Sequence, residues 1–137
     1  MRDLREAPRR GAAHAQPGED GRASLGYLFI ESERHAPHLD DLTDEEAAAL
    51  GRLRTRLARA LRIEVAALHV FAAVIGRNMD HFHEQMVARY PDTPADVPWH
   101  RSDEFAPRAN AEEVADLARR LARRLAGDDG PQGVRLD

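Results

Sequence analysis

Cysteine and lysine are both absent from the 137 residues of this chain. The lack of cysteine excludes disulfide bonds, zinc sites with cysteine ligands and catalysis by a thiol. Long apolar runs are also missing, because no stretch approaches the roughly 20 residues that a membrane-spanning helix requires. The first residues contain no apolar signal region. These absences lead us to expect a cytoplasmic protein that has no membrane partner.

The charges of the chain nearly balance, with a formal net charge of −4 at pH 7. This value provides no bulk attraction to nucleic acids or anionic lipids, so neither is expected as a partner. The arginines are spread over the whole chain, which favours a codon bias over a phosphate-binding cluster. A chain of this length and with 42% hydrophobic residues is expected to form one globular domain.

The composition changes along the chain and predicts three parts. Residues 1–22 are rich in Arg, Gly, Ala, Pro and acidic residues without periodicity, which is typical of a loosely ordered arm. His14 in this arm is expected to be solvated. Residues 23–126 contain the periodic segments and form the predicted domain. Residues 127–137 are polar and are expected to be a C-terminal tail.

Apolar runs predict three strands. Residues 25–30 and 68–75 are rich in strand-forming residues and are expected to be buried. A third strand over residues 81–89 should pair with the second through a short loop at residues 76–80. Residues 91–109 contain four prolines and are expected to be an ordered loop on the domain surface.

Two helices are predicted from capping residues and leucine spacing. The first starts at residue 43, where Thr43 and Glu46 form a capping box, and ends near residues 62–64. Leucines recur along it at helical spacing, and its arginines lie mostly off that stripe, on an expected solvated face. The second helix covers residues 111–126. Its expected cap and stop are Asn110 and Gly127.

The most reactive side chains lie in the third predicted strand. Side chains alternate between the two faces of a strand, so His81, His83 and Gln85 project from one face. A neutral imidazole can attack phosphorus and carry a covalent phosphoryl or nucleotidyl group. Such an attack needs donors for the phosphate oxygens. His83 lies between two such groups, and Asn78 in the preceding loop adds a third.

The same histidines permit two other interpretations. His81 and His83 could bind a metal as a His-x-His pair, provided that a third ligand comes from elsewhere. A cupin-type site would place a glutamate after the pair with three or four residues in between, where the chain has Val87 and Ala88. Alternatively, the histidines could hydrogen-bond within a structural sheet. The remaining candidates for a third metal ligand are His35, Glu84 and His100.

Several segments resemble the histidine triad (HIT) superfamily. The run Gly-x-Asn-x-x-His-x-His-x-Gln-Met-Val-Ala-Arg-Tyr at residues 76–90 is similar to its His-φ-His-φ-His-φ-φ motif, with Gln85 at the third histidine. Residues 26–35 resemble the family strand that is followed by a histidine, and residues 39–46 resemble the start of its long helix. The resemblance implies an α+β domain, in which a long helix packs on an antiparallel sheet and a C-terminal helix follows.

The resemblance also implies a role for each matching residue. His83 corresponds to the nucleophile that becomes covalently nucleotidylated, and His81 to the histidine that positions it. Gln85 and Asn78 correspond to phosphate contacts, and His35 to a supporting histidine. The implied activity is that of a nucleotidyl hydrolase or transferase, which acts on a nucleoside phosphate anhydride, ester or phosphoramidate. The implied protein is a homodimer that needs no cofactor.

The motif departs from the usual pattern at several positions. The His-x-His-x-Gln version resembles the branch that contains galactose-1-phosphate uridylyltransferase, whose members transfer the nucleotidyl group to a phosphate acceptor. Glutamine cannot act as a general acid, which favours exchange over hydrolysis. Glu84 lies where an apolar residue is usual, so this strand face is expected to be partly exposed or to serve another site. Asp80 adds negative charge beside the phosphate position.

These departures leave two alternatives open. One is a HIT-like domain with diverged chemistry, either a recruited biosynthetic enzyme or a metal-dependent enzyme that uses the His-x-His pair. The other is a nucleotide-binding module that lost catalysis with its third histidine.

Overall fold

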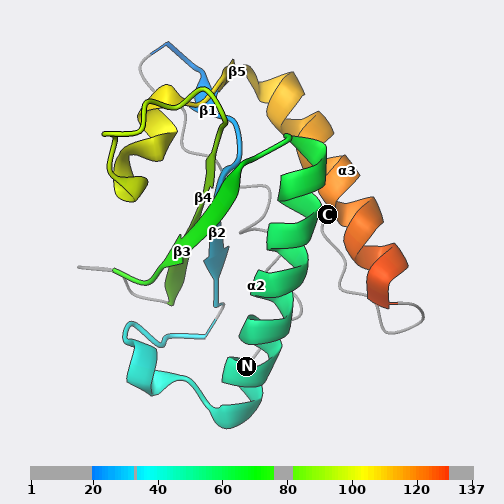
Figure 1. Ribbon diagram of the computed structural model, residues 1–137. Helices are drawn as coiled ribbons and strands as arrows, with labels where there is room; N and C mark the ends of the chain where they lie inside the picture. Colours follow the sequence, from blue (N-terminus) through cyan, green and yellow to red (C-terminus); the bar gives the residue numbers. More distant parts are fainter. Residues whose placement is uncertain (1–19, 33, 76–81, 130–137) are drawn as a thin grey trace.

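The computed structural model describes residues 20–32, 34–75 and 82–129 (Figure 1). Three residues discussed above, Asn78, Asp80 and His81, lie outside these ranges, as do the 76–80 loop and His14. The elements in chain order are β1 (Ala23–Ser24), β2 (Tyr27–Glu31), η1 (Leu39–Asp41), α2 (Asp44–Glu64), β3 (His69–Ala73), β4 (His83–Arg89), η2 (Trp99–Phe105), β5 (Arg108–Ala109) and α3 (Ala111–Asp129).

Three strands form the main sheet, in the order β2-β4-β3 with both pairs antiparallel. The predicted pairing of the second and third strands is therefore confirmed, and β4 also pairs with β2. On one side of β4, Glu31 lies opposite His83 and Tyr27 lies opposite Val87. On the other side, Ala73 lies opposite Gln85. The strand that carries the candidate residues is thus held from both sides.

Helix α2 packs on one face of the sheet, whereas η2 lies on the other side (Figure 1). Helix α3 runs alongside α2 and extends the helical layer. The two faces of the sheet therefore differ, because only one of them faces the layer formed by α2 and α3.

None of the helices in the described ranges combines the length and apolar character that crossing a membrane requires.

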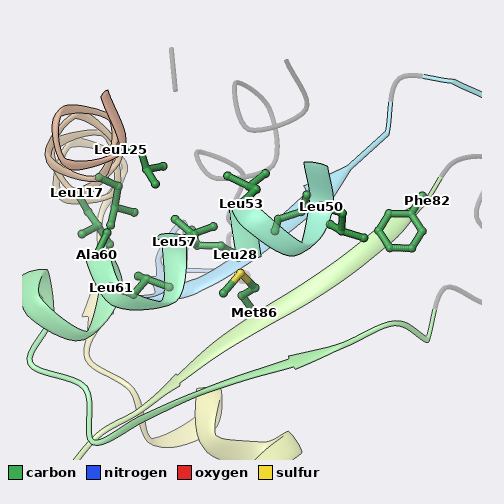
Figure 2. Close-up of a cluster of buried hydrophobic side chains, with 12 residues drawn as sticks. Leu28, Leu50, Leu53, Leu57, Ala60, Leu61, Phe82, Met86, Leu117 and Leu125 are labelled. Atoms are coloured by element: carbon green, nitrogen blue, oxygen red, sulfur yellow. The ribbon is translucent and has the colours of Figure 1, made fainter. Parts of the chain in front are cut away.

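The core lies between the sheet and the two helices (Figure 2). Leucines of α2 form the predicted buried stripe and contact Leu28 of β2 and Met86 of β4. Burying each such side chain contributes about 1.5–3 kcal/mol. Because Met86 and Phe82 face this core, the alternating residues His83 and Gln85 project from the opposite face. The helical residues of the core are Leu50, Leu53, Leu57, Ala60, Leu61, Leu117, Leu121 and Leu125.

Both helices begin at the predicted caps. The side chain of Thr43 accepts a hydrogen bond from the Glu46 backbone N–H at 3.1 Å, and the Glu46 carboxylate accepts one from the Thr43 N–H at 2.9 Å. Asn110 accepts a hydrogen bond from the Glu113 N–H at 2.9 Å. The prediction that α3 stops at Gly127 is wrong, because the helix continues to Asp129. A glycine inside a helix costs only about 1 kcal/mol relative to alanine, so its presence alone does not end a helix.

The strand predicted at residues 68–75 is present as β3, but the expectation that it is buried is wrong. Strand β3 lies at the edge of the sheet, and its residues His69 and Ala72 are exposed. Val74 and Ile75, which follow the strand, are exposed as well. An apolar run does not reveal how much of a strand other elements cover, and the edge position alone does not decide it, because β2 is also at an edge of this sheet. In contrast, the prediction for residues 25–30 is confirmed, because the centre of β2 is buried.

The proline-rich segment contains more regular structure than expected. It includes the 3-10 helix η2 and the short strand β5, which pairs with β1. Arg89 at the end of β4 holds this segment by donating hydrogen bonds to the carbonyl oxygens of Val97 at 2.8 Å and Pro94 at 2.9 Å. The same guanidinium donates to Ser102 Oγ at 3.2 Å. The segment is therefore tied to the strand that carries the candidate site.

A glycine permits the close approach of β2 and β4. Gly26 adopts φ +83°, and a Cβ at this position would lie 2.7 Å from the Cβ of Ala88. Ala88 donates its backbone N–H to the Gly26 carbonyl at 3.0 Å, and Tyr90 donates its hydroxyl to the Leu25 carbonyl at 2.6 Å. A side chain at position 26 would be strained and would collide with β4, so glycine fixes how these two strands meet.

Candidate active site

The candidate site lies on the sheet face opposite α2. Strands β2 and β4 each place alternate side chains on this face, because neighbouring residues of a strand point in opposite directions. Tyr27, Phe29 and Glu31 come from β2, and His83 and Gln85 come from β4. The antiparallel register brings these five residues into one cluster.

His83 is the most enclosed polar residue of the cluster, with 8% of its surface exposed. Its Nε2 forms a hydrogen bond with Oε1 of Glu31, the residue directly opposite it, and an ionised carboxylate can only accept in such a bond. The ring of Phe29 stacks on the imidazole, with a centroid separation of 4.7 Å and an interplanar angle of 22°. The stacked ring and the carboxylate together fix the plane and orientation of the imidazole.

Gln85 is oriented by a neighbouring tyrosine. The hydroxyl of Tyr27 donates a hydrogen bond to Oε1 of Gln85 at 3.0 Å. Burial raises the pKa of Tyr27, and the charge of Asp103 raises it further, so the hydroxyl stays protonated as a donor near neutral pH. With its oxygen occupied by this bond, the glutamine presents its NH₂ group as the end that can donate to an anionic ligand.

Glu84 lies on the opposite face of the sheet, and this corrects two expectations. It is only 2% exposed, and its Oε1 accepts hydrogen bonds from Nη2 of Arg54 at 2.7 Å and Nε at 2.9 Å. The strand face that carries Glu84 is thus buried rather than partly exposed. The sequence did not predict this partner because Arg54 is on α2 and faces Glu84 only after the helix packs on the sheet. Glu84 also lies on the wrong face to share a metal ion with His83.

The other predicted site residues are not part of this cluster. His35 is exposed and forms no hydrogen bond, ion pair or ring contact with another described residue. The ring of His100 packs edge-on against Trp99, which contacts Phe71 on β3. Since Asn78 and His81 lie outside the described residues, the structure brings together two of the predicted residues, His83 and Gln85.

The described residues contain no group of three or more histidine, aspartate or glutamate side chains that could hold a metal ion. The metal interpretation depends on His81 together with His83, and His81 is outside the described ranges. Glu31 contacts His83, but a histidine and one carboxylate provide fewer ligands than a zinc site requires.

Three residues of the cluster, Tyr27, Phe29 and Glu31, were not predicted to belong to it. They are spaced two apart in a predicted strand, which places them on one face. Their contact with His83 and Gln85 depends on the pairing of β2 with β4, whereas the sequence pattern predicted only the pairing of β3 with β4. The register between β2 and β4 is the information that would have identified them.

Comparison with known proteins supports the fold. No protein family and no curated protein matches the sequence. Among solved structures, a histidine triad protein from Bradyrhizobium japonicum is similar, with 21% identity, a TM-score of 0.59, and coverage of 81% of this chain and 89% of that chain. The C. elegans NitFhit protein matches with 20% identity, a TM-score of 0.49, and coverage of 76% of this chain and 24% of that chain.

A member of the HIT family from Bacillus subtilis matches with 19% identity and a TM-score of 0.40, over 77% of this chain and 88% of that chain. The similarity to the Bradyrhizobium protein agrees with the helix-covered antiparallel sheet described above. The chain therefore has the α+β fold of the histidine triad superfamily.

Proposed function

We propose that this protein is a nucleotidyl hydrolase or transferase with His83 as its nucleophile. Its substrate would be a nucleoside phosphate anhydride, ester or phosphoramidate. The observation that supports this proposal most directly is the position of His83 beside Gln85, on the sheet face opposite α2 of a histidine triad fold. An oriented imidazole next to an oriented amide donor is the minimal arrangement for attack on a phosphate group.

The proposed reaction has two steps. The unprotonated nitrogen of the neutral His83 imidazole attacks the phosphorus, the N–P bond forms, and the bond to the leaving group breaks. Water or a phosphate acceptor then attacks the same phosphorus, which breaks the N–P bond and restores the imidazole. The Gln85 NH₂ group donates to the phosphoryl oxygens in both steps. Because an amide cannot supply a proton to the leaving group, Gln85 favours substrates with good leaving groups and transfer to phosphate.

The remaining roles follow the resemblance and are part of the proposal. His81 positions His83, Asn78 is a second phosphate contact, and His35, in the turn after β2, supports His81. No cofactor is needed for the two steps. We further propose a cytoplasmic homodimer, in which apolar residues beside β3 such as Ile75, exposed at 58%, would be covered.

The first test is the substitution His83→Ala. Wild-type protein is incubated with a panel of nucleoside phosphoramidates, dinucleotides and sugar nucleotides, and intact mass detects a covalent nucleotidyl adduct. We expect His83→Ala to form no adduct and to lose turnover by at least about 10³-fold, because the nucleophile is missing. His69→Ala, which removes an exposed histidine of β3, is the matched control and should retain both properties.

Three results would contradict the proposal. Turnover that persists in a folded His83→Ala variant would exclude His83 as the nucleophile. Turnover that requires an added divalent metal ion would favour the metal-dependent alternative. Nucleotide binding without an adduct or product from any member of the panel would indicate a binding module.

A further inference from the structure

The carboxylate of Glu31 occupies Nε2 of His83, one of the two imidazole nitrogens at which a phosphate can bind. Oε1 of Glu31 contacts Nε2 of His83, so a phosphate oxygen that binds this nitrogen must take the place of Oε1. An anionic substrate therefore meets another anion at the imidazole that it needs. This arrangement makes Glu31 relevant to which phosphate groups the site accepts.

The backbone places Glu31 at this position. Glu31 is the last residue of β2 and is paired directly with His83 in the sheet. Ile30, the preceding residue, is fully buried in the core between the sheet and α2, and Phe29 stacks on the His83 ring. Adjacent strands are about 4.8 Å apart, so a side chain opposite His83 contacts it without any loop movement. The pairing of β2 with β4 therefore sets the contact between Glu31 and His83.

Glu31 differs from Glu84, the other carboxylate held by the sheet. Glu84 is 2% exposed and is bound by Arg54 inside the structure, whereas the side chain of Glu31 is 18% exposed. A partly exposed carboxylate can turn toward water without leaving its charge in a dry interior. Glu31 can thus be displaced from His83 by a ligand that tolerates its negative charge nearby.

We propose that Glu31 is a specificity-determining residue that selects the charge of the phosphate group accepted at His83. A dianionic phosphate is repelled about twice as strongly by the Glu31 carboxylate as a singly charged phosphate that is esterified or bridged on a second oxygen. The site therefore takes singly charged phosphate groups and rejects free phosphate and terminal phosphate monoesters. This inference rests on the proposed function, since it places a phosphate at His83.

The test measures binding rather than turnover. Inorganic phosphate, which is mostly dianionic at about pH 8, and singly charged dimethyl phosphate are titrated into wild type and Glu31→Gln, with binding followed by NMR. We expect Glu31→Gln to bind inorganic phosphate about tenfold more tightly and dimethyl phosphate only about threefold more tightly, because half the repulsion energy corresponds to the square root of the fold-change. The glutamine can still accept the hydrogen bond from His83, so the fold should persist.

Two control variants test whether the gain in phosphate affinity arises from the loss of the Glu31 charge next to His83. Glu45→Gln removes one negative charge from the exposed start of α2 and should leave phosphate affinity unchanged. Glu31→Gln combined with His83→Asn should lose the gain in affinity. A gain that also appears in Glu45→Gln, or one that survives in the double variant, would overturn the inference.

Other outcomes separate this inference from the proposed function. Equal, weaker or undetectable phosphate binding by Glu31→Gln would overturn the role of Glu31, as would an equal gain for both probes. If an adduct still forms on His83 in that case, the proposed nucleophile stands. Conversely, a selective gain in phosphate affinity without an adduct from any substrate would remove the proposed catalysis and leave the role of Glu31 in place.

Discussion

At the scale of single residues, the amide of Gln85 depends on one hydroxyl for its orientation. Tyr27 donates to Oε1 of this amide at 3.0 Å and leaves the NH₂ group for a ligand. Without that hydrogen bond the amide could rotate, and either end could meet the phosphate. In the proposed reaction, the tyrosine is therefore a positioning residue that acts through Gln85.

The substitution Tyr27→Phe tests this role. We expect kcat to fall about tenfold, because the amide donor is no longer preorganised toward the charge that develops on the phosphate. The midpoint of thermal unfolding should change little, since the aromatic ring and its edge-on contact with Phe29 at 5.1 Å are retained. Steady-state kinetics on the best substrate of the panel measures the effect. An unchanged kcat would show that Tyr27 does not orient Gln85.

Residue identity predicted part of this site and not the rest. His83 and Gln85 could be placed on one face because alternation along a single strand requires no tertiary information. The different partners of the acidic residues Glu31 and Glu84 could not be predicted in the same way. Glu31 reaches His83, and Glu84 reaches Arg54, through contacts that depend on how β2 and α2 pack against β4.

At the scale of elements, one ion pair joins α2 to the inner face of the sheet. Arg54 is 40% exposed, whereas its partner Glu84 is 2% exposed and lies among core residues. Removing the arginine would leave a buried carboxylate without a counter-charge, which is strongly destabilising. Replacing both partners with apolar side chains removes that cost and is often neutral or stabilising.

A double-mutant cycle tests this pair. We expect Arg54→Met to lower the free energy of unfolding by about 2 kcal/mol, a value reduced to allow for the partial exposure of Arg54. Combining Arg54→Met with Glu84→Met should restore stability to within about 1 kcal/mol of wild type. Urea unfolding measures both changes, and Arg59→Met on an exposed position of α2 is the matched control. A double variant that is no more stable than Arg54→Met would rule out this account.

Elements with strong local signals were predicted, and those without such signals were not. Helix α2 combines a capping box with a leucine stripe, and both features depend on residues within five turns of each other. Strands β1 and β5 have two residues each, too few for any periodicity to be seen. Their pairing joins Ala23 to Ala109, which only the folded chain brings together.

At the scale of the whole molecule, a carboxylate at each end of α2 accepts hydrogen bonds from arginines of other segments. At its start, Glu46 accepts a hydrogen bond from Arg34 at 2.8 Å, and at its end Glu64 accepts hydrogen bonds from Arg120 at 2.7 Å and Arg124 at 2.6 Å. Burial raises the pKa of Glu46, but the hydrogen bonds from Arg34 and Thr43 outweigh it and the net pKa is lowered. Hydrogen bonding to Arg124 and Arg120 lowers the pKa of Glu64.

These shifts predict a loss of stability in acid. A carboxyl whose folded-state pKa lies below its unfolded value stabilises the protein above the unfolded pKa, about 4.3 for glutamate. That stabilisation is lost as the pH falls from about 4.3 through the lowered folded-state pKa. We expect a Glu46→Gln/Glu64→Gln variant to be less stable than wild type at about pH 7 and to lose less stability between about pH 5 and pH 3.

Urea midpoints measured over that pH range provide the comparison. The two proteins should converge in stability at the acidic end, because protonated glutamate and glutamine both lack the charge. Parallel curves with a constant separation would mean that these two carboxyls do not couple folding to protonation.

The Glu31–His83 contact also has a consequence for how the protein is made. The two residues are 52 positions apart in the chain, with the whole of α2 between them. During synthesis, β2 emerges first and has no partner in the main sheet until β4 has been translated. Contacts between residues so far apart in the sequence form late, because the chain loses entropy on closing the intervening loop before strand pairing provides any stabilisation. The candidate cluster is therefore absent from every shorter nascent chain, and the proposed activity would begin only when folding across the sheet is complete.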